Sequence, residues 1–333
     1  MTAATLEREA DADKGILDIE TLTDAPWFPP LIDPQFFDFV RAEGRVPRLG
    51  DSRPPYSYKG WLLFQVWMLS GARGIHSRWI HYFETLAAGR LPDRPIPPLN
   101  FRPAEDAKGR ILKALGKMVE KLGRDHGYGE RALNVLIEWV AFALACDCDP
   151  EPDIPASTSR WLYETFDVSQ LLSHPYDYLG DMLEQHRGKS KRFQGFFLTH
   201  ERVCELMTEL ASADYDGDLR LALVYEPAAG SSRQLLQFSE LSHRLVGQDI
   251  DPVCVKISRI NGTLYAPALA FPIPDSILRA SGPQTEAGHA VASPCEEQQH
   301  HAAPTPEATA GPEEAPGGEQ PAEYRQSSLF DLL

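Results

Sequence analysis

Apolar residues in the first half of the chain recur at helical intervals. Between residues 107 and 122 they stand one, three or four residues apart, so that one face of a helix is apolar. Residues 58–69 (YKGWLLFQVWML) are apolar on almost every face, a pattern typical of a buried helix. Further helices are predicted over 75–88 and 130–146. Together these patterns predict an α-helical domain over residues 26–173.

A different pattern begins near residue 174, where short apolar runs alternate with amphipathic stretches. This order predicts parallel strands joined by a right-handed crossover, and thus an α/β domain over residues 174–280. The expected elements are a helix over 200–213, a strand over 219–225, a helix over 233–241, a strand over 244–250 and a helix over 252–261. The edges and faces of such a small parallel sheet must be covered, either by the helical half or by a partner subunit.

The two ends of the chain have a polar composition. Residues 281–324 are rich in Pro, Glu, Ala, Gly and Gln and contain few large apolar residues, so they cannot bury enough surface to become ordered. We expect this disordered linker to join the α/β domain to a short apolar segment at 325–333. Residues 1–25 are also expected to be disordered.

Charge and cysteine content restrict the possible functions. The net charge of −16 argues against a broad, non-specific nucleic-acid surface, although a local basic patch over 187–192 remains open, with an exposed solvated loop as the alternative. The five cysteines are irregularly spaced, which predicts a reduced, cytoplasmic protein without a metal site. We expect His76 and His81 to lie on a helix surface. No stretch reaches the ~18 apolar residues of a membrane span, and no secretory signal is evident.

Small residues follow the first predicted strand, and an acid ends the second. Residues 227–232 read PAAGSS, and a turn of this kind lets a ligand approach the backbone at Gly230. Glu226 closes the first strand. Asp249 follows about 20 residues later, an offset at which a carboxylate can accept hydrogen bonds from ribose hydroxyls. The alternative is a purely structural turn in which Ser231 or Ser232 caps the next helix.

Three ordered blocks resemble the cofactor-binding part of adenine-N6 DNA methyltransferases. They are residues 194–199 (QGFFLT), 226–232 (EPAAGSS) and 247–261 (GQDIDPVCVKISRIN), and residues 177–180 (DYLG) resemble a helix that precedes them in that family. The resemblance covers about residues 174–268. It implies a partial class I methyltransferase sheet, which is Rossmann-like and parallel, and it implies S-adenosylmethionine as the cofactor.

The resemblance also implies roles for individual residues. Phe197 and Thr199 would contact the methionine portion of S-adenosylmethionine, Glu226, Ala228 and Gly230 would line the cofactor, Asp249 would hold the ribose, and Ile250 would pack against adenine. Two positions depart from the family pattern, because Ser232 replaces the last glycine of the turn and His200 replaces a proline. The larger side chain of Ser232 leaves open whether the site admits the cofactor.

The catalytic motif of that family, Asn or Asp followed by Pro-Pro and an aromatic residue, is absent after Asn261. The nearest segment, residues 271–275 (FPIPD), lacks the amide that would accept hydrogen bonds from a flipped adenine. Whether the chain is an enzyme is therefore open. It could be a catalytically incomplete accessory protein, one half of a split adenine-N6 methyltransferase whose partner carries the motif, or a scaffold with an empty remnant pocket.

The end of the chain resembles a second known motif. Residues 326–330 (QSSLF) are similar to the peptide that binds the bacterial sliding clamp, with Gln326 as the polar anchor and Leu329 and Phe330 as apolar plugs. A tethered peptide of this kind gains affinity through effective concentration. The resemblance implies a bacterial or mobile-element protein that reaches DNA through the clamp. The alternative is a chance apolar terminus.

Overall fold

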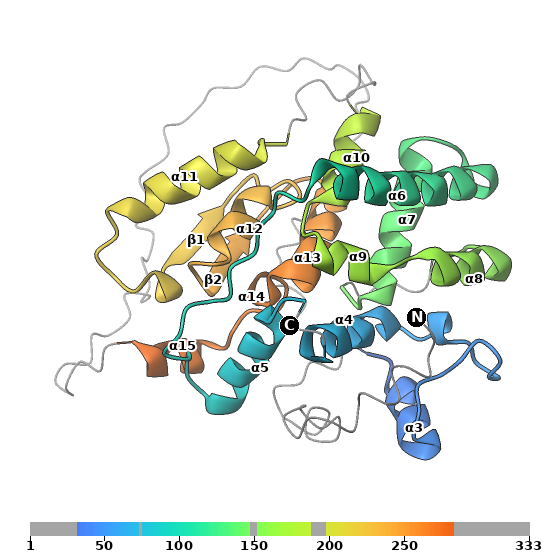
Figure 1. Cartoon of the computed structure of the whole chain (residues 1–333), viewed down its shortest axis with the longest axis horizontal. Helices are drawn as coiled ribbons and strands as arrows, with labels where there is room; N and C mark the ends of the chain where they lie inside the picture. Colours follow the sequence, from blue (N-terminus) through green and yellow to red (C-terminus); the bar gives the residue numbers. More distant parts are fainter. Residues whose placement is uncertain (1–31, 73–74, 147–151, 188–197, 283–333) are drawn as a thin grey trace, which may run out of the picture. The chain divides into compact units, whose positions relative to one another are not determined.

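Helices dominate this computed structural model, which describes residues 32–72, 75–146, 152–187 and 198–282 (Figure 1). The first half contains α3 (Pro34–Glu43), the turn η1 (Pro55–Ser57), α4 (Trp61–Ala72), α5 (Arg78–Ala88), α6 (Glu105–His126), α7 (Glu130–Ala143), α8 (Ala156–Thr165) and α9 (Val168–Ser173). The second half contains α10 (Tyr178–Arg187), α11 (Glu201–Ala213), η3 (Leu219–Leu221), β1 (Leu223–Glu226), α12 (Arg233–Phe238), β2 (Arg244–Gly247), α13 (Pro252–Tyr265), α14 (Pro267–Ala270) and α15 (Asp275–Ser281). The predicted segments 1–25 and 325–333, and the linker after Gly282, lie outside the described residues.

The helix boundaries follow from local chemistry. The apolar stripe predicted over 107–122 forms the buried face of α6, and acidic Glu105 and Asp106 occupy its first turn, where the helix dipole favours negative charge. Helix α5 ends at Gly89, whose φ of 64° is the left-handed conformation that glycine adopts without strain. The helical character of the first half is confirmed.

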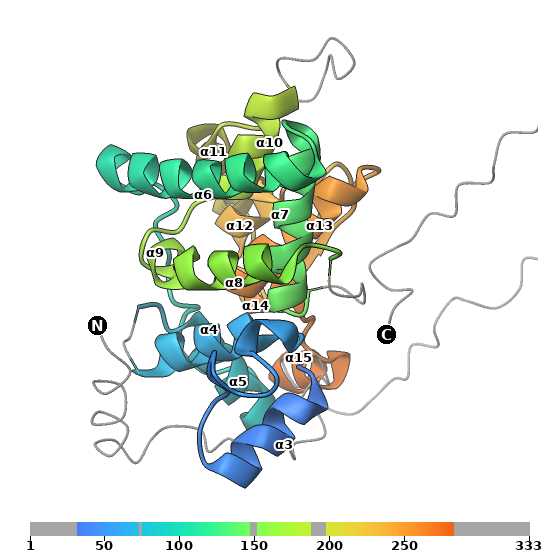
Figure 2. The same cartoon turned by 90° about the vertical axis from the view of Figure 1, so that its right-hand side faces the viewer.

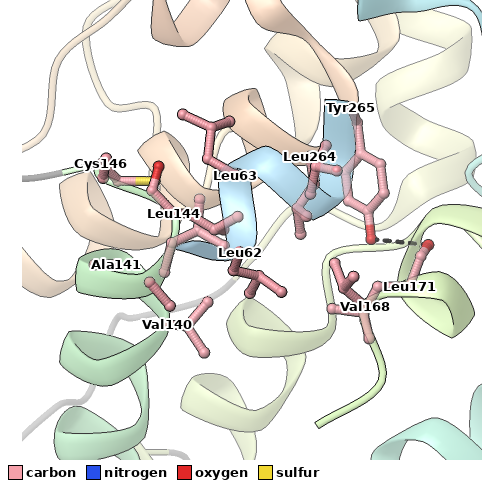
Figure 3. Packing of buried hydrophobic residues seen from close by; sticks show 14 of the residues in the cluster. Leu62, Leu63, Val140, Ala141, Leu144, Cys146, Val168, Leu171, Leu264 and Tyr265 are labelled. Carbon is pink, nitrogen blue, oxygen red and sulfur yellow. Dashed lines mark hydrogen bonds between the residues drawn. The ribbon is translucent and has the colours of Figure 1, made fainter. Parts of the chain in front are cut away.

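One hydrophobic core joins the two halves of the described chain. Side chains from α4, α7, α9 and α13 meet in Figure 3, where the hydroxyl of Tyr265 donates to the carbonyl of Leu171 at 3.2 Å. The indole of Trp79 in α5 donates to the carbonyl of Thr263 in α13 at 2.9 Å. The helical half therefore packs directly against the helices that follow the strands, an arrangement visible in Figure 2. The described residues, which end at Gly282, all belong to one compact unit.

Strands β1 and β2 form a small parallel sheet, with Leu223 paired with Arg244 and Glu226 paired with Gly247. Helix α12 connects them and packs against both strands (Figure 1). Both strands are shorter than predicted. Residues 219–221 form the turn η3 instead, because the carboxylate of Asp218 accepts a hydrogen bond from the backbone N–H of Arg220. The described chain is thus mostly helical with a two-stranded parallel sheet, which is compatible with an α/β fold.

Candidate site at the carboxyl ends of the strands

The turn after β1 is held tightly against the end of β2. The N–H of Ala229 donates to the carbonyl of Gln248 at 2.8 Å. Gly230 has a φ of 55°, a left-handed conformation that a side chain would strain. A Cβ atom at Gly230 would also lie 3.3 Å from Cδ2 of Leu198, so the segment before α11 reaches this turn. Parts of all three sequence blocks that carry the resemblance therefore lie together.

Asp249 follows β2 and faces this turn. Its Oδ2 accepts a hydrogen bond from the N–H of Gly230 at 2.7 Å, and its Oδ1 accepts one from the N–H of Asp251 at 2.9 Å. A carboxylate offers about four lone-pair positions, so each oxygen retains one for a ligand. The protein thus fixes the orientation of a half-buried carboxylate while leaving it able to accept two further hydrogen bonds.

The other predicted cofactor residues lie on the solvent-facing side of the turn, hereafter called its outer side. Glu226 Oε1 accepts from the N–H of Ala228 at 3.2 Å, and Ala228 and Thr199 are exposed. Ile250 is 99% exposed, which is unusual for a large apolar side chain. Phe197 lies outside the described residues. The structure therefore brings Gly230, Asp249 and their neighbours to one surface, with an apolar side chain beside the acid.

The inner side of the same turn is structural. Ser232 is fully buried with a φ of 70°, and its hydroxyl is hydrogen-bonded to that of Ser258 in α13. Its side chain makes no capping hydrogen bond to α12. Ser232 therefore stands at the N-cap position of α12 without capping the helix through its hydroxyl, and its buried side chain lies away from the outer surface.

Sequence reasoning did not identify the centre of this inner side, Asp177. Its Oδ2 accepts hydrogen bonds from Ser231 Oγ and, at 2.8 Å, from Arg233 Nε, while its Oδ1 accepts from Asn261 Nδ2 at 2.9 Å and from the N–H of Gly180 at 3.0 Å. Asp177 therefore joins α10, the turn after β1, α12 and α13. The available signal was the DYLG sequence itself, because a Cβ at position 180 would collide with the Asp177 carboxylate.

Arg233 supplies the positive charge of this junction. Its side chain is 8% exposed and is paired with Asp177, while Asp181 and Glu201 lie within 3.6 Å. Burial works to lower the pKa of Arg233, but Asp177, together with Tyr176 and Glu201, shifts it upward overall. The junction therefore surrounds one buried cation with carboxylates, and these contacts fix the turn in place.

The basic patch considered for 187–192 loses its first member. Arg187 is buried and paired with Glu130 at 2.8 Å and with Asp251, the N-cap of α13. Burial works to raise the pKa of Asp251, yet Arg187 and the N–H of Val253 hold it below its ordinary value. Arg187 therefore anchors α10 to α13, and residues 188–192 lie outside the described part of the chain.

Asn261 and Phe271, which bound the stretch searched for the family's catalytic motif, both contact other parts of the fold. Phe271 packs against Trp79, with ring centroids 5.6 Å apart, and Asn261 is committed to Asp177 and to the carbonyl of Ser231. Cys146, Cys204 and Cys254 are buried, and Cys146 Sγ lies 3.2 Å from the hydroxyl of Thr263. Among the described residues no cluster of His, Cys, Asp and Glu could hold a metal, and no helix is long and apolar enough to cross a membrane. Gln326, Leu329 and Phe330 lie outside those residues.

Comparison of the chain with protein-family models, curated proteins and solved structures finds no match. The assignment of a function therefore depends on the geometry of this surface.

Proposed function

We propose that this protein is a DNA methyltransferase-like protein that binds S-adenosylmethionine at the carboxyl ends of β1 and β2 but lacks its own catalytic motif. The observation that carries the proposal is Asp249. Two backbone N–H groups orient its carboxylate beside the glycine turn, and two of its lone-pair positions remain for ribose hydroxyls. The exposed Ile250 beside it gives the adenine ring an apolar surface to cover. The sheet would then be the remnant of a Rossmann-like methyltransferase fold.

A second candidate is one half of a split adenine-N6 methyltransferase, and a particular surface favours it. Helix α11 buries only Cys204 and Thr208, whereas its apolar side chains Val203, Leu206, Met207 and Leu210 are exposed. Strand β1 also exposes Leu223 and Tyr225, and no described strand pairs with its outer edge. An unpaired strand edge and an uncovered apolar helix face are what a strand-bearing partner would cover.

We further propose that residues 326–330 bind the bacterial sliding clamp and bring this cytoplasmic protein to DNA. Fluorescence anisotropy of the full chain with purified clamp tests this part. The Phe330→Ala variant is expected to lose most of the binding, because the phenyl ring is one of two apolar plugs. Undiminished binding by that variant would remove the tether.

Isothermal titration calorimetry with S-adenosylmethionine tests the cofactor site. A dissociation constant near 1 μM corresponds to about −8 kcal/mol. Asp249→Ala is expected to weaken binding by at least about 100-fold, because two hydrogen bonds to a charged group are lost, each contributing about 1.5–3 kcal/mol.

Asp216→Ala is the matched control, since Asp216 is an exposed aspartate outside the turn. It should bind S-adenosylmethionine as the wild type does. No binding by the wild type at millimolar ligand would reject the cofactor proposal and leave a clamp-bound scaffold as the remaining function.

A further inference from the structure

Arg78 is a buried cation at the first turn of α5, where the helical half meets the second half. It is 2% exposed. Its Nε donates to the carbonyl of Pro97 at 2.8 Å, and its Nη1 donates to the carbonyl of Tyr265 at 3.0 Å and to the hydroxyl of Ser239. All of these acceptors are neutral. Nη2 is buried and has no hydrogen-bond partner among the described residues.

The described residues also leave the charge of Arg78 without a paired carboxylate. In that part of the chain its hydrogen bonds all go to neutral oxygens, and no carboxylate pairs with it. Glu240 is the acid that acts on it through space, and it offsets only part of the effect of burial, which lowers the pKa of Arg78 to about 9. The guanidinium therefore remains charged at neutral pH, and a buried charge without a counter-charge is costly.

A hollow of about 20 Å³ lies beside this cation. Its polar lining comes from Arg78, His81, Tyr82, Ser239 and His243, and its remaining lining is apolar, so it contains no acidic residue. Nδ1 of His81 is a second buried polar atom without a partner. The volume holds about one water-sized particle.

We propose that this hollow binds a small monovalent anion of the size of chloride, with Arg78 Nη2 as its principal donor. A single anion would neutralise the buried guanidinium and occupy its unsatisfied donor at the same time. A water molecule would accept a hydrogen bond from Nη2 but would leave the positive charge of the guanidinium without a counter-charge. The space holds about one water-sized particle, which matches a single halide ion better than phosphate or a carboxylate. Because Arg78 contacts both α13 and the segment after α12, an anion there would strengthen the junction between the two halves.

Bromide is a direct probe, because it resembles chloride and scatters X-rays anomalously. Crystals of the full chain soaked in sodium bromide are expected to show an anomalous peak within hydrogen-bond distance of Arg78 Nη2. Arg233 is the internal control, since it is also buried but is surrounded by carboxylates, and no peak is expected beside it. A hollow without an anomalous peak, or one that holds only water, would overturn the proposal.

Thermal unfolding distinguishes a site that is occupied in solution from one that holds only an adventitious ion. At constant ionic strength, replacing sodium gluconate by sodium chloride should raise the Tm by about 2–4 °C or more as the site fills. Ser239→Ala, which removes a neighbouring hydroxyl without removing the cation, should require a severalfold higher chloride concentration for the same rise. A bromide peak with no chloride-dependent change in Tm would show binding at crystal concentration only and would also overturn the proposal.

Discussion

Arg78 and Arg233 are buried arginines in two regions of the molecule, and their surroundings differ. Asp177 pairs with Arg233, and Asp181 and Glu201 stand close to it. Arg78 is surrounded by two carbonyls, a hydroxyl and two histidines that line the same hollow. The comparison teaches that burial alone does not make an arginine structural. An arginine whose counter-charge comes from the chain stabilises the fold by itself. An arginine without such a partner leaves a position where a bound anion can supply the counter-charge.

The largest expected effect comes from removing the counter-charge of Arg233. Asp177→Ala removes the carboxylate that accepts four hydrogen bonds and leaves Arg233 buried beside weaker partners. Removing one member of a buried pair costs about 3–5 kcal/mol, so the free energy of unfolding measured in urea should fall by that amount.

Asp106→Ala is the control for this variant, because Asp106 pairs with Arg110 on the exposed surface of α6. It should leave the free energy of unfolding nearly unchanged. A loss of less than about 1 kcal/mol in Asp177→Ala would mean that Asp181 and Glu201 suffice for Arg233.

Acid should affect the region of Arg78 first. Burial lowers the pKa of His76 and His81 to about 4 and that of His243 to about 3. These side chains stay neutral in the folded protein while the unfolded chain takes up protons below about pH 6.5. Stability should therefore be complete above pH 6.5 and fall as the pH approaches 4, by up to about 1.4 kcal/mol per pH unit for each histidine.

Urea unfolding between pH 4.5 and 6.5 measures this slope. The region of Arg233 contributes little there, because the pKa of Glu201 lies below its ordinary value and its stabilising effect is lost only at lower pH. His243→Gln should reduce the slope by the share of one histidine. An unchanged slope in His243→Gln would contradict the assignment of the acid sensitivity to this region.

Elements with a local sequence pattern could be predicted from the sequence. The predicted exposure of side chains was wrong where the contacting residue is distant in the chain. The apolar stripe of α6 is visible in a single window, and so is the turn at Gly230 followed by Asp249. His76 and His81 were expected on a surface but are buried, because His81 packs against His243, with their Nε2 atoms 3.3 Å apart. No helical periodicity reveals a contact between residues so far apart in the chain.

The same reason explains why the two sides of the turn were not distinguished. On the outer side, the proximity of Gly230 and Asp249 could be predicted because these residues follow the two strands of one strand–helix–strand unit. The inner side depends on Asp177 and Ser258, whose partners come from other elements. The left-handed conformation of Ser232 determines which side its hydroxyl faces, and this conformation cannot be predicted from the serine alone.

The smallest effect on stability is expected from substitutions on the exposed face of α11, because they remove neither a charged group nor a buried side chain. Leu206 and Leu210 are 53% and 67% exposed, so the double variant Leu206→Gln and Leu210→Gln should change the free energy of unfolding by less than about 0.5 kcal/mol. Leu235→Gln in α12 is the buried counterpart and should destabilise strongly. If the double variant also loses co-purification with a polypeptide that carries the missing catalytic motif, the uncovered face is an interface. If it destabilises the isolated chain by more than 1 kcal/mol, the face is packed within this chain, and the argument for a split enzyme fails.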